Sequence, residues 1–68
     1  MNDIVMILEH EHGNTVLLTR NLQHEQGAHL SLQVMISRGW TAYKDVHRNH
    51  SLGLYSFTVK MEAMTHQI

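Results

Sequence analysis

The longest apolar run in the chain, Ile4 to Leu8, restricts the possible folds more than any other feature. On an extended backbone, successive side chains point to opposite faces. Ile4, Met6 and Leu8 therefore fall on one face, and Val5 and Ile7 on the other. A strand that is apolar on both faces needs cover on both. The run is too short to cross a membrane or to form the core of a signal peptide.

The length of 68 residues predicts a single small domain that spans residues 1–68. A domain of this size buries only about 60% of the surface of its unfolded chain, so its core is marginal and extra support is expected. Cysteine is absent, which excludes disulfides, thiolate nucleophiles and iron–sulfur clusters. The remaining sources of support are a partner chain or a metal ion held by histidine.

The composition predicts a folded protein. Hydrophobic residues make up 43% of the chain and charged residues 16%, which is too apolar and too weakly charged for a disordered segment. The formal net charge of −1 gives no general attraction to nucleic acid or to an anionic membrane. We therefore expect a soluble, cytoplasmic protein.

Four strands are predicted from alternation and turn residues. Residues 3–9 and 15–19 form a hairpin around Gly13 and Asn14, since both residue types tolerate the positive φ of tight turns. Residues 55–63 show the most regular alternation of apolar and polar side chains. Residues 40–46 form a weaker strand joined to them by a polar connection.

The segment 22–38 decides the fold class. As a helix it carries an apolar stripe, begins after Asn21 as N-cap and ends before Gly39; the stripe comprises Ala28, Leu32, Met35 and Ile36. As a strand it alternates through Leu30, Leu32, Val34 and Ile36. We prefer the helix because its residue types favour helices and a strand would leave a long loop. The predicted fold is α+β, with one helix packed on a small antiparallel sheet (ββαββ). The alternative is an all-β, five-stranded meander or small barrel.

Motifs for catalysis are missing from the sequence. It contains no Gly-x-Ser-x-Gly elbow, no phosphate-binding glycine loop and no dinucleotide fingerprint. A chain this short also has few residues with which to wall a catalytic pocket. We therefore expect a protein that is not an enzyme and has no cofactor.

The leading functional prediction is a binding or regulatory module that docks a sheet face or an edge strand on a protein partner. One helix can cover only one face of the first hairpin, so Val5, Ile7 and Leu17 are predicted to contact a partner. That partner is either a second copy of the chain or a larger protein that the chain inhibits or assists. Accessory proteins of this size are common in phages and mobile elements, which makes such an origin an expectation.

Two alternative functions remain open. The first is a zinc site, because histidines two residues apart on an extended chain point the same way; its four ligands would be His10, His12, His47 and His50. The second is binding of single-stranded nucleic acid through cations and stacking rings, using Trp40, Tyr43, Lys44 and Arg48.

Overall fold

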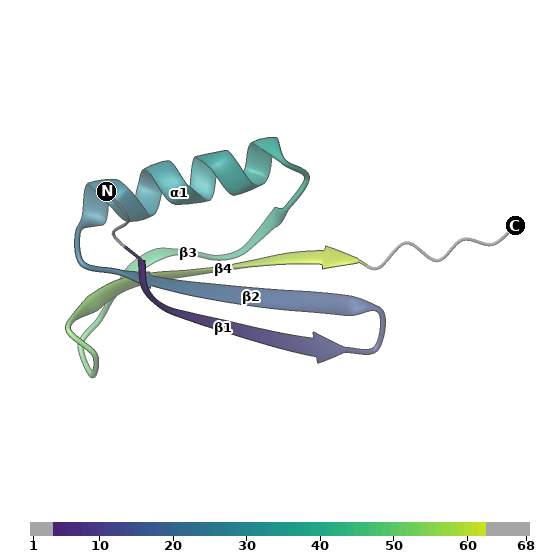
Figure 1. Ribbon diagram of the computed structural model, residues 1–68, viewed down its shortest axis with the longest axis horizontal. Helices are drawn as coiled ribbons and strands as arrows, with labels where there is room; N and C mark the ends of the chain where they lie inside the picture. The colour runs from purple at the N-terminus through teal and green to yellow at the C-terminus, as the bar shows by residue number, and fades with distance from the viewer. Residues whose placement is uncertain (1–3, 63–68) are drawn as a thin grey trace, which may run out of the picture.

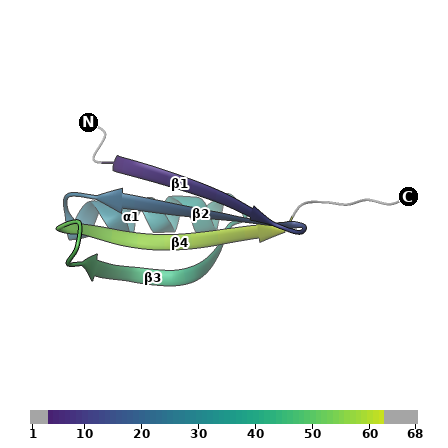
Figure 2. The same ribbon diagram turned by 90° about the horizontal axis from the view of Figure 1, so that it is seen from below.

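An antiparallel sheet carries one helix across one of its faces in the computed structural model, which describes the backbone of residues 4–62 and the side chains of residues 13–62 (Figure 1). The elements follow the order β1 (Ile4–His12), β2 (Thr15–Leu22), α1 (Glu25–Ser37), β3 (Thr41–Asn49) and β4 (Leu54–Glu62). The strands lie in the order β1-β2-β4-β3, so β1 and β3 form the two edges (Figure 2). The prediction of a small α+β fold is confirmed.

The ambiguous segment 22–38 is helical, and the all-β alternative is therefore wrong. The helix is shorter than predicted, because β2 continues through Asn21 and Leu22. These two residues pair with Ser56 and Tyr55 of β4. Asn21 is thus a buried strand residue and not the N-cap, which is His24.

The end of α1 agrees with the prediction. Gly39 directly follows the C-cap residue and adopts a φ of +102°, a conformation that favours glycine. The backbone N–H of Trp40 donates to the carbonyl of Met35 at 3.0 Å. The chain therefore turns back at once, and the Trp40 ring packs against the core.

The core lies between α1 and the sheet. Its fully buried apolar side chains are Leu22, Ala28, Leu32, Met35, Phe57 and Val59. Ile36 was predicted to belong to this stripe but is 43% exposed. The reason is that each helical residue is rotated by about 100° from the last, which turns Ile36 away from the line through Ala28, Leu32 and Met35.

The face of the central strands that points away from α1 is polar. The Ser56 hydroxyl donates to Asn21 Oδ1 at 2.5 Å, and the hydroxyl oxygens of Thr19 and Thr58 lie 2.8 Å apart. Asn21, Ser56 and Thr58 are buried. Because buried polar groups must be paired, these two cross-strand bonds help to fix the register of β2 against β4.

Candidate docking surface

The helix does not extend over the whole sheet. Within residues 4–62, α1 lies against β2, β3 and β4, and not against β1. Figure 2 shows β1 running outside the helix along one edge. The longest apolar run of the sequence, residues 4–8, therefore lies on an edge strand that α1 does not cover.

One side of α1 faces this uncovered strand. Arg20 of β2 donates from Nη1 to the Ser31 hydroxyl at 2.9 Å, and β2 lies between β4 and β1. The side of α1 that carries Ser31 therefore faces β1. Val34 follows Ser31 by one turn, and Leu30 lies one turn before Val34. Leu30 is 61% exposed and Val34 is 46% exposed.

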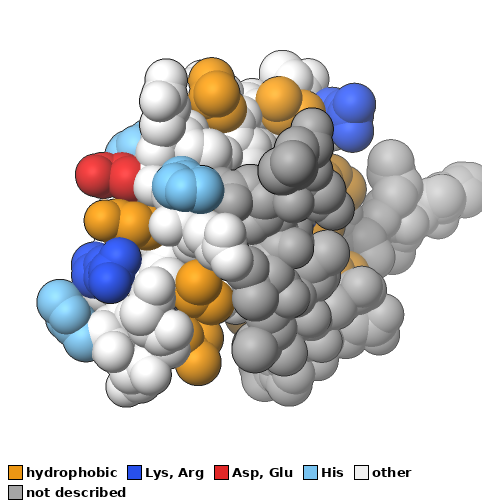
Figure 3. Space-filling model, turned by 60° about the vertical axis from the view of Figure 1, so that its left-hand side comes forward, with side chains coloured by type: hydrophobic (Ala, Val, Ile, Leu, Met, Phe, Trp, Pro, Cys, Tyr) orange, Lys and Arg blue, Asp and Glu red, His pale blue; other side chains and the backbone are white. Residues whose placement is uncertain are grey.

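The exposed surface of α1 is almost uncharged. From Gln26 to Ser37 the sequence contains no Asp, Glu, Lys or Arg. A helix that faces water normally carries charged residues on its outer side. In the space-filling view, hydrophobic side chains reach the surface over α1 at the top of the molecule (Figure 3). Sequence reasoning missed Leu30 and Val34 as surface residues, although the absence of charge was a readable signal.

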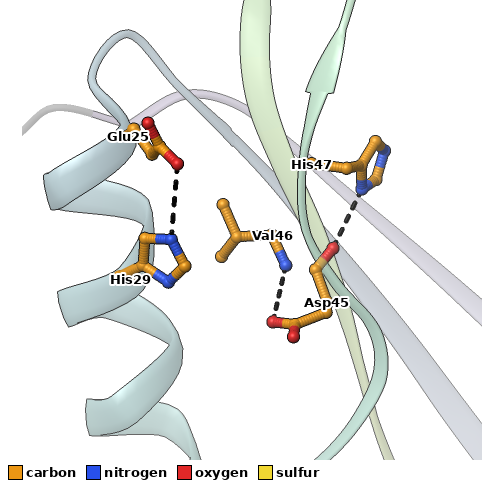
Figure 4. Close-up of polar contacts among 5 residues, drawn as sticks. All are labelled: Glu25, His29, Asp45, Val46 and His47. Atoms are coloured by element: carbon orange, nitrogen blue, oxygen red, sulfur yellow. Dashed lines mark hydrogen bonds and ion pairs between the residues drawn. The ribbon is translucent and has the colours of Figure 1, made fainter.

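The opposite side of α1 has different chemistry. Glu25 Oε2 lies 3.7 Å from His29 Nε2, one turn apart on the helix. Figure 4 shows both side chains on the side of α1 that faces β3, near Val46. The charged and titratable groups of the helix therefore gather on the β3 side.

The two edge strands differ in the same way. β3 has register shifts between Ala42 and Lys44 and between Lys44 and His47. Its side chains are mostly exposed, and several are charged. Register shifts and charged residues are devices that protect a sheet edge from pairing. In β1 the pairing runs without interruption from Met6 to His12, and one shift occurs between Ile4 and Met6.

The strand pairing does not group the predicted docking residues on one face of the sheet. Leu17 is half-buried on β2 and pairs with Lys60 of β4 and His10 of β1, whereas the neighbouring Leu18 packs against the core. Leu17 therefore belongs to the polar face of the sheet. Ile7 pairs with Arg20, so the pairing groups Ile7 with Arg20 and not with Leu17. The side chains of Ile7 and Val5 lie outside the described residues.

The four predicted zinc ligands lie near opposite ends of the sheet (Figure 1). His12 pairs with Thr15, which in turn pairs with Glu62, whereas His47 pairs with Ser56. Glu62 and Ser56 are six positions apart along β4, which corresponds to roughly 20 Å.

The structure therefore does not bring the pair His10 and His12 together with the pair His47 and His50. The His47 ring instead donates from Nδ1 to the Asp45 carbonyl at 2.9 Å. Among the described residues, no group of three or more His, Asp or Glu side chains is arranged to hold a metal ion. The side chains of His10 and His12 lie outside the described residues.

The predicted nucleic-acid residues are dispersed. Trp40 is half-buried against the core, and the Arg48 guanidinium lies 4.8 Å from the centre of the Tyr55 ring, which also packs against the core. Lys44 instead pairs with Thr58 of the polar face. Tyr43 is 57% exposed on β3. The four residues therefore do not form one stacking surface.

Comparison with family models, curated proteins and solved structures finds no match to this chain. In the part of the chain that the structure describes, no helix has the length and apolar character needed to cross a membrane.

Proposed function

We propose that the protein is a non-enzymatic binding or regulatory module that docks on a protein partner through its β1-side surface. This surface consists of the edge strand β1 together with Leu30 and Val34 of α1. The observation that carries the proposal is the position of the longest apolar run on a sheet edge that the helix does not cover. Such a surface in water is a typical site of protein association.

The β1-side surface offers two kinds of interaction. An unpaired strand edge presents backbone N–H and C=O groups, which a partner strand can bind. The adjoining helix side presents Leu30 and Val34 without a charged neighbour from Gln26 to Ser37. Depletion of charge at the centre is the compositional mark of protein interfaces.

Arg20 adds a polar group beside this surface. Its guanidinium is bound to Ser31, but its Nε is buried without a hydrogen-bond partner in the described part of the chain. A buried donor without an acceptor costs free energy. A partner that brings a carbonyl or carboxylate oxygen to this point would satisfy the Arg20 Nε.

The test uses two positions with the same exposure. Val34 and Leu52 are each 46% exposed, but Leu52 lies in the turn between β3 and β4. A photoreactive amino acid is placed at position 34 or at position 52 in the cells that produce the protein, and covalent products are identified by mass spectrometry. We expect a defined protein product from position 34 and none from position 52.

Either kind of product, a doubled chain or a chain joined to another protein, supports the proposed function. Equal labelling at both positions, or none at position 34 in a chain whose circular dichroism shows it to be folded, would contradict the proposal.

A further inference from the structure

Resting on the proposed function, we propose that the partner of the β1-side surface is a second copy of this chain. In this arrangement the two α1 helices lie side by side between two sheets. Each helix covers its own β2, β3 and β4, and also covers β1 of the other copy.

The sheet is wide enough to carry a second helix beside α1. Neighbouring strands lie about 4.8 Å apart and packed helices lie about 8–10 Å apart, so a sheet of four strands offers room for two helices side by side. Residues 4–62 supply one helix, and it lies toward β3. Among the described residues no helix lies above β1, so this position can take a second helix.

Helix α1 itself has the length and the exposed apolar residues that a helix above β1 requires. Its 13 residues span about 20 Å, which fits along the nine residues of β1, about 30 Å long. Leu30 lies two residues after the buried Ala28 and two residues before the buried Leu32. It is therefore on the side of the helix opposite the core, where it can contact the sheet of the second copy. Val34, on the side that faces β1, can meet the second helix.

The contact between the two copies is reciprocal. In a two-fold dimer the same surface is contributed by both copies. The chain carries both halves of the contact: an edge strand that α1 does not cover, and a helix side with exposed apolar residues and no Asp, Glu, Lys or Arg from Gln26 to Ser37. On the α1 side of the sheet, the pairing places Ile7 beside Arg20, and Glu9 and Glu11 farther along β1, so the second helix would lie over the Ile7 end of the strand. Gly27 and Ser31 are small residues on the same side of α1, which permits a close approach of the second helix.

The area that the two copies would bury is sufficient for a dimer. Each copy offers three surfaces to the other: the outward face of α1, the side of α1 next to β1, and the β1 half of the sheet. Each surface measures about 20 × 10 Å. The two copies together would bury on the order of 1,200 Å², which lies at the lower end of stable protein interfaces. The arrangement is therefore large enough for a reversible dimer.

The first experiment measures the native mass of the full chain by sedimentation equilibrium. We expect about twice the chain mass of 7.9 kDa. Leu30→Glu and Val34→Glu should each raise the dimer dissociation constant at least about tenfold, because each places an unpaired charge in the interface. Ile36→Glu is the matched control: it lies on the same helix, is 43% exposed, and is on the other side. It should leave the dissociation constant unchanged.

The second experiment does not depend on stability. Because the chain has no cysteine, Val34→Cys and Ile36→Cys each introduce one thiol per copy. A short bis-maleimide should link two copies through position 34 and not through position 36. Equal linking at both positions, or none at position 34, would overturn the arrangement.

The outcomes separate the two proposals. A monomeric chain at 100 μM, or a dimer that tolerates both Leu30→Glu and Val34→Glu, overturns the second-copy inference. If the chain is monomeric, the proposed function still stands when the photoreactive group at position 34 captures a different protein. If nothing is captured at position 34, both the proposed function and the second-copy inference are wrong.

Discussion

The β1 side and the β3 side of the molecule belong to one sheet, but their edge strands differ in sequence and in the regularity of their pairing: β1 is apolar from Ile4 to Leu8 before Glu9 and Glu11. β3 is interrupted by two register shifts and carries Lys44, Asp45 and Arg48. The helix side above it carries the Glu25–His29 pair. β1 begins with five apolar residues, and the helix side next to it has no charged residue from Gln26 to Ser37.

This difference shows which edge is built to remain alone in water. A sheet edge can pair with foreign strands, and natural proteins protect it by bulges, charges or cover. β3 uses the first two of these devices. β1 has apolar residues over the stretch where β3 has charges, and α1 does not cover it. This difference is the reason for our proposal that another chain covers the β1 edge.

The largest expected effect comes from the core that both sides share. Phe57 is fully buried on β4, between α1 and the sheet. Phe57→Ala should lower the free energy of unfolding by about 3–5 kcal/mol, measured by urea denaturation, because it removes a ring and leaves a cavity. Tyr43→Ala, on the exposed β3 edge, is the control and should change stability far less. A loss below about 1 kcal/mol for Phe57→Ala would contradict a shared core that depends on this ring.

The next prediction compares the edges directly. Lysine is a residue that natural sheets use to prevent edge pairing. Ile7→Lys on β1 should weaken association strongly, whereas Tyr43→Lys on β3 should not change it. The expected difference in the free energy of association is about 2 kcal/mol or more, since a charge is placed within one contact only. Sedimentation of the two variants, with circular dichroism to verify folding, measures it. If the two variants sediment equally, the proposal that only the β1 edge takes part in association is wrong.

A smaller loss of stability is expected from a change between β2 and β4, the two central strands that connect the β1 side to the β3 side. Ser56→Ala removes the buried donor to Asn21 Oδ1 and should lower the free energy of unfolding by about 1–2 kcal/mol. Ser37→Ala is the control, because the Ser37 hydroxyl bonds the carbonyl of Val34 on the exposed helix surface. We expect less than about 0.5 kcal/mol for this variant. Similar losses in thermal or urea unfolding would contradict a special role for the buried pair.

Local patterns in the sequence were sufficient to predict the elements. The helix followed from residue types and from Gly39 at its end, and the last strand from its alternation. The start of the helix was wrong because Asn21 is held in β2 by pairing with Ser56, a contact between residues 35 positions apart. A capping residue and a strand residue look alike when only neighbouring positions are considered.

The candidate surface was predicted only in part, because it depends on where the helix crosses the sheet. The two-sided apolar character of residues 4–8 indicated an uncovered strand. Which side of α1 adjoins that strand follows from a tertiary contact between Arg20 and Ser31, which no local pattern reveals. Leu30 and Val34 therefore became visible as part of the surface only in the structure.

The smallest expected effect compares one arginine from each side. Arg48 lies 4.8 Å over the Tyr55 ring on the β3 side, so Arg48→Met should lower the free energy of unfolding by about 0.5–1 kcal/mol. Arg20→Met on the β1 side removes the bond to Ser31 but also removes an Nε that has no hydrogen-bond partner among the described residues. These two effects oppose each other, and we expect a net change below about 0.5 kcal/mol in urea unfolding. A loss above about 1.5 kcal/mol for Arg20→Met would mean that the Arg20 guanidinium already makes its hydrogen bonds within the chain. The proposal that a partner supplies an acceptor to the Arg20 Nε would then be wrong.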